Sequence, residues 1–387
     1  MPAPTAEAVT GALRGVIDPE LGDNIVDLKM VRGVDIDGGV VIVHLALTIA
    51  GCPLRTQLND DAVARVSSIP GVESVKVVMG EMDAAEKRAV MERARWKIRE
   101  NAPATEIPPT ARVAAIASGK GGVGKSSVTA NLAAGLAQRG FTVGVMDADI
   151  AGFSIPRMLG TRGRHVEAVP NPNDPERPQF RPIEQRVGDG LLKIVSMGSL
   201  PGAGEDEALM WRGLVLNRAV QHFLEDVRWG DMDYLLIDMP PGTGDIQMGL
   251  ARMLPRAEMI IVTTPALAAQ KVAARAADMA RRGYLRVVGV IENMSAFVCD
   301  HGEHYELFGS GGGRRLAAQV GVPLLGSIPL DTSVAAGGDA GTPVVVGGSG
   351  PAAEAYAALV ERLVTDAMPP VEMSGCSARL ADLLSRS

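Results

Sequence analysis

The sequence predicts an α/β protein in which a small N-terminal α/β unit precedes a larger unit built on a mostly parallel sheet flanked by helices. The first observation is that, from residue 113 onward, short apolar runs alternate with helical segments, which is typical of a parallel sheet covered on both faces. The second is a glycine-rich stretch, Gly119–Ser127, that directly follows the first of these runs. The third is a proline-containing segment at 101–110, which favours a semi-rigid linker between the two units.

The N-terminal unit is predicted to span residues 1–85. We expect a helix over 5–17, which ends before the turn sequence Asp-Pro-Glu-Leu-Gly. Strands are expected over 40–48 and 71–79, on either side of a helix over 55–68. A unit of this size is large enough to fold alone.

The larger unit is predicted over residues 111–365, after a charged helix and Pro-rich linker at 86–110 and before a C-terminal tail at 366–387. Ligands on such sheets bind at the carboxyl ends of the strands, which is where the glycine-rich stretch falls. Residues 160–190 are rich in proline, arginine and asparagine and are expected to form a surface excursion. The predicted strands are 113–118, 142–147, 191–197, 234–238, 259–263, 287–292 and 323–328.

Composition limits the kinds of partner and the cellular compartment that we expect for this protein. The 387 residues carry a formal net charge of −7, which gives no global attraction to nucleic acid, so we expect no nucleic-acid partner. The three cysteines, Cys52, Cys299 and Cys376, are too widely spaced for a disulfide framework and fit a reducing compartment. The N-terminus lacks the pattern of a secretory signal, and no apolar run reaches the length of a membrane span. We therefore expect a cytoplasmic protein with no membrane partner.

The glycine-rich stretch matches the phosphate-binding pattern G-x-x-x-x-G-K-[ST], with Gly119, Gly124, Lys125 and Ser126 at the fixed positions. Glycines let backbone N–H groups close around phosphate oxygens, Lys125 is expected to reach the β- and γ-phosphates, and Ser126 to ligate Mg²⁺. The alternative is a flexible glycine turn, which does not account for a match at all four positions. The pattern predicts a P-loop NTPase fold. The expected nucleotide-binding residues of the loop are Gly119, Lys120, Gly121, Gly122, Val123, Gly124, Lys125, Ser126 and Ser127.

A second lysine, Lys120, stands directly after the first glycine and gives the sequence Gly-Lys-Gly-Gly-Val-Gly-Lys-Ser. This is the deviant Walker A form, in which Lys120 resembles the signature lysine that crosses a dimer interface to the partner's nucleotide. In that place it would neutralise charge on the transferring phosphoryl group, as an arginine finger does. The alternative is an ordinary surface lysine on a loop. The pattern implies ATP as the ligand, a homodimer, and a catalytic role for Lys120.

Two of the predicted strands end in acidic residues. Asp147 and Asp149 follow the second strand of the larger unit, and Asp238 ends the fourth in the Walker B pattern. An acid at this place beside a phosphate loop holds Mg²⁺ or its water, or orients the attacking water. The alternative for Asp147 and Asp149 is that they only form a turn. The loop at 240–245, rich in proline and glycine, is expected to sense the γ-phosphate.

Nine sequence blocks occur in order between residues 110 and 365: GKGGVGKSS, MDADIAGFSIPRMLG, MGSL, WRG, DYLLIDMPPGTGD, TTP, ENMS, FGSGGG and IPLD. Together they resemble the Mrp/ApbC group of P-loop ATPases, which carry and deliver iron–sulfur clusters. Residues 5–85, with DPELG, NIVDLKMV and LTIAGCPL, resemble the small domain of iron–sulfur assembly proteins such as the SufT type. That domain often precedes Mrp ATPases in bacteria, so the two resemblances agree.

The resemblance assigns roles to residues outside the loop. It implies that Asp149 orients the attacking water and that Asp147 and Asp238 belong to the Mg²⁺ shell. Asn293 matches the family's adenine-recognising asparagine, and an amide both donates and accepts, as an adenine edge requires. Taken alone, an asparagine after a strand is more often a turn residue.

The family's cluster site is a Cys-x-x-Cys pair shortly after the Asn-Met-Ser block, and here the pair is incomplete. Cys299 fits the first position, whereas Gly302 fills the second. A bridging cluster needs about four ligands, and two copies of Cys299 supply only two of them. The open alternatives are that His301 or His304 completes a mixed site, that Cys376 folds back, or that Cys299 is a relic and no cluster binds stably.

Cys52 follows the strand over 40–48 and opens a helix, whose N-terminus favours the thiolate form of a cysteine. It resembles the cysteine of the small domain's motif, which implies that it helps to hold or transfer a cluster. The alternative is a cysteine that is simply packed.

The leading hypothesis is an ATP-binding and ATP-hydrolysing iron–sulfur cluster carrier or assembly factor. It would load clusters and transfer them to apoproteins as a homodimer, with ATP and Mg²⁺ as cofactors and iron–sulfur apoproteins and assembly proteins as partners. The alternative is a ParA/MinD-like dimerisation switch that uses ATP without a stably bound cluster. The N-terminal unit argues against that alternative, as does the lack of a C-terminal amphipathic membrane helix.

Overall fold

The structure is a computed structural model of the whole chain. It describes residues 4–19, 21, 23–47, 54–83, 86, 90, 105–149, 152–171, 174, 176–200, 213–242, 249–250, 253–254, 256–282, 285–299, 301 and 303–371. The predictions made for Cys52, Gly302, Cys376, residues 243–245 and nearly all of the charged helix before the linker lie outside these residues.

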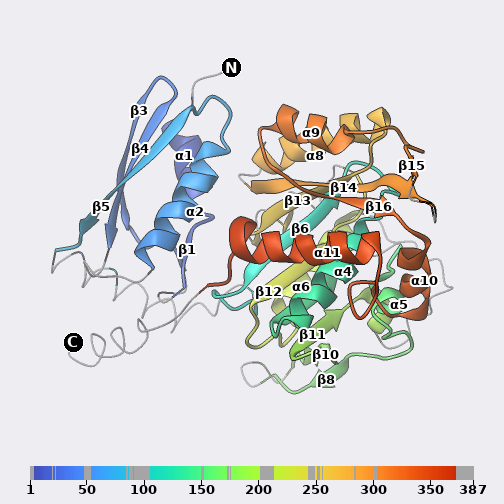
Figure 1. Cartoon of the computed structure of the whole chain (residues 1–387). Helices are drawn as coiled ribbons and strands as arrows, with labels where there is room; N and C mark the ends of the chain where they lie inside the picture. Colours follow the sequence, from blue (N-terminus) through green and yellow to red (C-terminus); the bar gives the residue numbers. More distant parts are fainter. Residues whose placement is uncertain are drawn as a thin grey trace.

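The N-terminal unit is a three-stranded sheet with two helices packed on one face (Figure 1). The central strand pairs antiparallel with the first strand and parallel with the third. Its core is formed by apolar side chains of the helices and the central strand, among them Leu13, Leu45 and Leu58. The elements are α1 (Ala6–Leu13), β1 (Ile17–Asp18), β2 (Asp23–Asn24), β3 (Val31–Asp37), β4 (Val40–Leu47), α2 (Arg55–Ser67) and β5 (Ser74–Glu81).

The larger unit is built on a sheet of nine strands in the described part of the chain, in the order β10-β11-β7-β12-β6-β13-β14-β15, with β16 also paired to β14. Only the β10–β11 and β14–β15 pairs are antiparallel, so the predicted mostly parallel sheet is confirmed. Its strands are β6 (Arg112–Ser118), β7 (Thr142–Asp147), β10 (Ile183–Val187), β11 (Gly190–Val195), β12 (Tyr234–Asp238), β13 (Glu258–Thr263), β14 (Arg286–Val298), β15 (His304–Tyr305) and β16 (Leu324–Leu330).

Helices cover this sheet (Figure 1). Helices α4 and α11 pack against each other, α4 also on β7 and β11, while α8 and α9 form a second pair that packs on β13 and β14. A small hairpin of β8 (Glu167–Val169) and β9 (Gln179–Arg181) lies within the expected surface excursion. The helices are α4 (Lys125–Gln138), α5 (Ile155–Met158), α6 (Gly213–Glu225), α8 (Leu267–Arg282), α9 (Gly312–Val320), α10 (Thr332–Ala340) and α11 (Pro351–Arg362), with short turns η1 (Met197–Ser199) and η2 (Leu363–Ala367).

The central strands are buried on both faces, which explains why they are nearly continuous apolar runs in the sequence. Every residue of β12 and β13 is buried, including the acids Asp238 and Glu258 at their ends. The acid at the end of β12 lies at the carboxyl edge, where P-loop sites form, and the acid at the start of β13 lies at the opposite edge. The sheet therefore carries buried charge at both ends of its strands.

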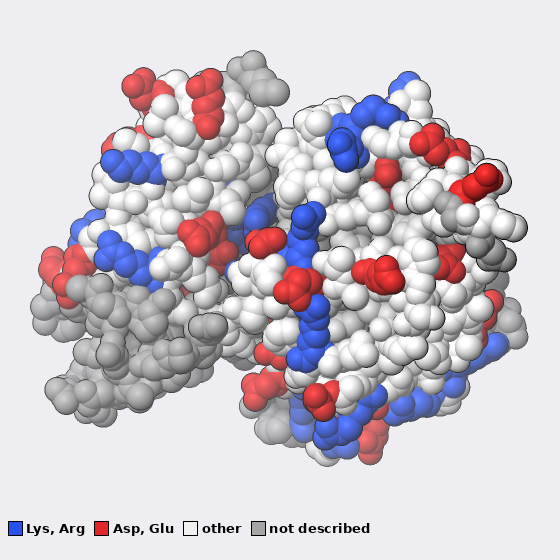
Figure 2. Space-filling view, viewed as in Figure 1, with Lys and Arg blue, Asp and Glu red and all other residues white. Residues whose placement is uncertain are grey.

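The two units lie side by side, with α2 facing the larger unit (Figure 1). Arg65 of α2 donates to the carbonyl oxygen of Arg256 at 2.8 Å, and Arg112 of β6 donates to Asp61 of α2 at 3.2 Å. Acidic and basic side chains are both visible where the units meet (Figure 2). The N-terminal unit thus docks against the edge of the sheet opposite to the glycine-rich loop.

Candidate functional site

The glycine-rich loop connects the carboxyl end of β6 to the first residue of α4, as the motif predicts. Gly122 and Gly124 have φ values of +77° and +79°, in the left-handed region that side chains disfavour. Gly119 lies directly against the backbone of Val272 and Ala273 in α8, so a Cβ atom at this position would collide with them. The loop conformation therefore depends on glycine at these positions.

A buried polar network lies directly behind the loop. The Lys125 ammonium donates to Asp238 Oδ1 at 2.7 Å and lies 3.9 Å from Asp149 Oδ2. Ser126 Oγ donates to Asp238 Oδ2 at 2.5 Å, and Thr129 Oγ1 lies 3.2 Å from Asp238 Oδ1. Asp238 is fully buried, so these three donors satisfy a carboxylate that would otherwise be costly to bury. The arrangement brings together the lysine, the serine and the Walker B acid that the sequence singled out.

Asp147 lies beside Asp238, because the two residues are paired in register where β7 and β12 end. Its carboxylate accepts hydrogen bonds from the backbone N–H groups of Asp149, Ser154 and Ile155 and from the hydroxyl of Ser196, at 3.1–3.3 Å. Burial, followed by the neighbouring Asp238, raises the pKa of Asp147 to about 8. In this structure Asp147 organises the turn after β7, and its predicted role in the Mg²⁺ shell stays a prediction.

Asp149 faces the same site from the turn after β7. Burial raises its pKa, the nearby Lys125 ammonium lowers it, and the net pKa lies above the ordinary value. The Asp149 carboxylate is partly buried and lies 3.9 Å from the Lys125 ammonium, so it faces the phosphate loop. This geometry is compatible with the predicted water-orienting role.

Lys120 is exposed at the tip of the loop, in contrast to the buried Lys125. Its carbonyl oxygen accepts a hydrogen bond from the hydroxyl of Ser118 at 3.0 Å, which fixes the backbone and leaves the side chain on the surface. The backbone N–H of Gly242 donates to the carbonyl of Ser118 at 3.1 Å, so the start of the loop after β12 lies against the phosphate loop. The side chain of Lys120 is thus available to a second subunit.

Asn293 lies within β14, and its side chain is buried beneath the phosphate loop. Its amide group donates to the carbonyl oxygen of Val123 at 2.9 Å, and it fills the space that a Cβ atom on Gly124 would need. Asn293 therefore supports the loop, a role that sequence reasoning missed because it depends on how β14 lies against the loop in the folded chain. The predicted contact with adenine is a separate matter and stays a prediction.

Cys299 directly follows β14, at a hairpin in which Val298 pairs with His304. Its backbone N–H donates to the carbonyl of Glu303 at 3.0 Å, and its side chain is partly exposed. His301 and His304 are exposed on the same hairpin, and Leu307 and Phe308 follow as exposed apolar side chains. Within the described residues, no group of three or more Cys, His, Asp or Glu side chains is close enough to hold a metal ion.

The oxygen atoms around Asp238 fit a magnesium ion. Mg²⁺ prefers oxygen ligands and takes one or two carboxylates together with phosphate oxygens and water. Ser126 Oγ and the Asp238 carboxylate lie next to each other, at the base of the loop in which the phosphates would bind. The residues present therefore match the donor set that the motif predicts.

Comparison with known families agrees with this geometry. A family model described as ParA, NUBPL iron-transfer P-loop NTPase, matches residues 110–364, which is more than half of the chain. The chain belongs to this family. A second model, described as iron–sulfur cluster assembly protein, matches residues 6–77, so the NUBPL-type NTPase unit is preceded by a unit of that kind.

Several curated relatives of this NUBPL-type NTPase cover almost its whole length. The iron–sulfur cluster carrier protein of Mycobacterium tuberculosis is 44% identical over 347 residues, which are 88% of this chain and 87% of the relative. The protein of the same name from Synechocystis is 40% identical over 88% of this chain and 92% of the relative. Among solved structures, a nucleotide-binding protein from Archaeoglobus fulgidus in complex with ADP is 34% identical, with a TM-score of 0.49 over 59% of this chain and 86% of that one.

Thr129 is a further residue of the NTPase site that the sequence motif did not identify. It lies one helical turn after Lys125 on the inner face of α4, is fully buried, and contacts both Asp238 Oδ1 and the carbonyl of Lys125. The signal was present as a polar residue four positions after the P-loop lysine, on a helix whose other buried side chains are apolar except for Lys125 and Asn131.

In the part of the chain that the structure describes, no helix is both long enough and apolar enough to cross a membrane.

Proposed function

We propose that this protein is an ATP-binding and ATP-hydrolysing iron–sulfur cluster carrier that works as a homodimer in the cytoplasm and delivers clusters to apoproteins. The observation that carries the proposal is the 44% identity to a protein named as an iron–sulfur cluster carrier, over nearly all of both chains. The two family matches support it, because an iron-transfer NTPase and a cluster assembly unit occur in one polypeptide.

The ATP phosphates would lie in the loop of residues 119–127, where backbone N–H groups and the start of α4 provide positive potential. The Lys125 ammonium is already held at this place by Asp238 and Asp149, so it is oriented before a nucleotide binds. A positioned ammonium needs little reorganisation when charge develops on the transferring phosphoryl group.

Ser126 and Asp238 would hold Mg²⁺, and Asp147 lies beside Asp238 at the end of the neighbouring strand β7. When bound, the ion neutralises charge on the β- and γ-phosphates. Thr129 keeps the Asp238 carboxylate in its orientation, and Asp149 would orient the attacking water. These assignments give each acid at the carboxyl edge of the sheet a separate task.

Lys120 would reach the nucleotide of the second subunit, because its side chain is exposed while its backbone is fixed. In Lys120→Ala, we expect ATP to bind with an affinity within about twofold of wild type, while kcat falls by about 10²-fold or more, as for the loss of a transition-state charge contact. The matched control is Lys76→Ala, which removes an exposed lysine of β5 and should change neither quantity. Turnover that is unchanged in Lys120→Ala would contradict the role across the dimer.

The proposed binding of an iron–sulfur cluster rests on the hairpin that contains Cys299. In a homodimer, two copies of this hairpin would contribute two thiolates, and His301 and His304 of the same hairpin would complete a mixed site. The test is transfer: the protein is loaded anaerobically, freed of excess iron, and mixed with an apoprotein whose activity depends on an iron–sulfur cluster. We expect activation by the wild type and none by Cys299→Ala. Equal activation by free iron and sulfide at the same concentration would contradict carriage.

A further inference from the structure

The junction between the two units is lined by charged groups from both sides. At the edge of the sheet opposite to the phosphate loop, three adjacent strands begin with Arg112, Glu258 and Arg286. Helix α2 brings Asp61 and Arg65 to the same place, one helical turn apart. The charges therefore come from parts of the chain that are distant in sequence.

The two carboxylates of this junction already have arginine partners. Glu258 is buried and accepts from Arg286 at 2.6 Å, and Arg112 lies 3.9 Å from its second oxygen. Asp61 accepts from Arg112 at 3.2 Å. Because each carboxylate is engaged in this way, neither is left over for a further cation.

Two other arginines lie here without such a partner, Arg65 buried and Arg256 partly buried. Arg65 is 4% exposed, and within the described residues its guanidinium donates one hydrogen bond, from Nη2 to the carbonyl oxygen of Arg256 at 2.8 Å. Its Nη1 is buried and has no hydrogen-bond partner among the described residues. Arg256 donates to the carbonyl of Ile107 at 2.9 Å. Within the described residues, neither guanidinium has a carboxylate oxygen within 4.0 Å.

A cavity of about 30 Å³ lies between the units at this point, and Arg65, Arg112, Arg256, Asp61 and Glu258 line it. A space of that size holds one small ion or one or two water molecules. The lining carries three arginines and two carboxylates, and Glu258 is also engaged by Arg286, so the described arginines of the junction outnumber its carboxylates. Burying an uncompensated charge is expensive, and among the described residues no carboxylate is left to balance this excess; a partner that fits the space must therefore be small and negatively charged.

We propose that this cavity is a binding site for a small monovalent inorganic anion of the halide class, held by Nη1 of Arg65. The anion would supply counter-charge to the junction and hold the N-terminal unit against the start of β6, the strand that leads to the phosphate loop. Phosphate and sulfate do not fit this proposal, because their five heavy atoms need more room than a space of about 30 Å³ offers. Burial lowers the pKa of Arg65 although Glu258 and Asp61 act to raise it, and burial together with Arg65 lowers the pKa of Arg256 to about 10.

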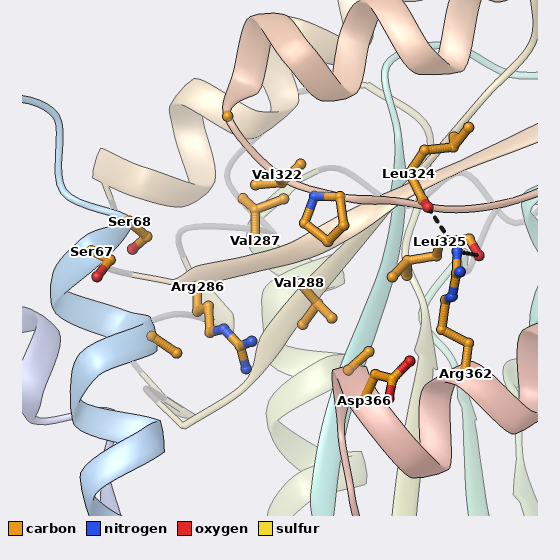
Figure 3. A pocket seen from close by; sticks show the side chains of 14 residues that line it. Ser67, Ser68, Arg286, Val287, Val288, Val322, Leu324, Leu325, Arg362 and Asp366 are labelled. Carbon is orange, nitrogen blue, oxygen red and sulfur yellow. Dashed lines mark hydrogen bonds between the residues drawn. The ribbon is translucent and has the colours of Figure 1, made fainter. Parts of the chain in front are cut away.

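A larger cavity nearby differs from this one in how its arginines are engaged. It has a volume of about 550 Å³ and lies between the end of α2 and the starts of β14 and β16 (Figure 3). Its two arginines are already engaged, Arg286 with Glu258 and Arg362 with the carbonyl oxygens of Leu324 and Leu325. No unpartnered cation faces it among the residues that line it, so the anion is assigned to the smaller cavity.

The direct test is a crystal of the full chain grown with sodium bromide and measured at the bromine absorption edge. We expect an anomalous peak within hydrogen-bonding reach of Arg65 Nη1. A cavity that contains only water, or no density at all, would overturn the proposal.

The solution test uses chloride itself and separates a true site from binding at crystal concentration only. Chloride NMR should show saturable line broadening in the wild type and in Arg55→Met, an exposed arginine of the same helix, and none in Arg65→Met. If Arg65→Met does not fold, the wild type alone decides. At ten times the Kd, chloride should raise its Tm over that in gluconate of equal ionic strength by roughly 2 °C. An anomalous peak without any saturable effect in solution would overturn the proposal. ATP turnover is read separately, so failure here leaves the proposed function untouched.

Discussion

The packing of Asn293 beneath the phosphate loop makes a quantitative prediction about two neighbouring glycines. Gly122 and Gly124 have nearly the same backbone conformation, with φ of +77° and +79°. A Cβ atom on Gly122 would meet nothing within 4 Å, whereas one on Gly124 would collide with the amide group of Asn293. Replacing each glycine by alanine therefore separates backbone strain from the collision.

The expected magnitudes follow from these contacts. For Gly122→Ala, left-handed strain of about 1–2 kcal/mol is offset by about 0.4–1 kcal/mol from the stiffer unfolded chain, which leaves a net loss of about 1 kcal/mol. Gly124→Ala has the same strain, and it also displaces Asn293 from its 2.9 Å hydrogen bond to Val123. Losing that bond adds about 1 kcal/mol, so Gly124→Ala should lower the free energy of unfolding by about 2 kcal/mol.

The assay is urea unfolding of the nucleotide-free protein, with each alanine made both alone and in an Asn293→Ala background. We expect the two alanines to differ by about 1 kcal/mol in the wild-type background, which corresponds to about 2–4 °C in Tm. In the Asn293→Ala background the difference should disappear, because the colliding amide is gone. Equal costs for the two alanines in the wild-type background, or a difference that survives the removal of Asn293, would refute the placement of Asn293 under the loop.

Two further predictions concern the acids of the site. Thr129→Val should lower the free energy of unfolding by about 1.5–2 kcal/mol and weaken binding of Mg²⁺-ATP, because a buried hydroxyl no longer contacts Asp238; unchanged urea unfolding and unchanged calorimetric affinity would contradict this. The pKa of Asp147 is raised from 3.8 to about 8, so the folded state binds its proton more tightly and the free energy of unfolding should fall as pH rises through this range. Asp147→Asn should flatten that slope in nucleotide-free protein, and a slope equal to that of the wild type would show that other groups cause it.

The sheet and the loop were predictable because their causes are local. Buried parallel strands are continuous apolar runs, and all seven strands predicted for the larger unit are present, with ends that differ by up to six residues. The largest difference is β14, which continues to Val298 because its second half stays paired with β15 and β16 after the apolar run ends. The phosphate loop was predictable because its glycines and Lys125 act through their own backbone and side-chain chemistry.

Other features depend on tertiary contacts that no local pattern reveals. Strand β3 was not predicted, because Gly33, Asp35 and Asp37 interrupt its apolar residues and only pairing with β4 defines it. The excursion at 160–190 contains the β8–β9 hairpin and β10. These strands were not predicted, because the segment is rich in proline and arginine. The helix predicted over 5–17 ends at Leu13, and residues 17–18 form β1 instead.

The same distinction holds for the site. A motif singled out Lys125, Ser126 and Asp238, and the structure brings these three side chains together, while their roles toward phosphate and Mg²⁺ stay predictions. The supports around them, Thr129 on α4 and Asn293 on β14, become visible only when the helix and the strand are packed together. Cys52 and Cys376 lie outside the described residues, so their predicted roles stay predictions.

Cluster uptake at Cys299 is the most direct test of the central claim that this protein is an iron–sulfur cluster carrier. The protein is reconstituted anaerobically with iron and sulfide, desalted, and measured for visible absorption and iron per dimer, as wild type and as Cys299→Ala. Parallel His301→Ala and His304→Ala variants identify which imidazole, if either, completes the site. We predict a cluster in the wild type and its loss in Cys299→Ala. A wild type that takes up no cluster, or a Cys299→Ala protein that takes up as much as the wild type, would contradict this account.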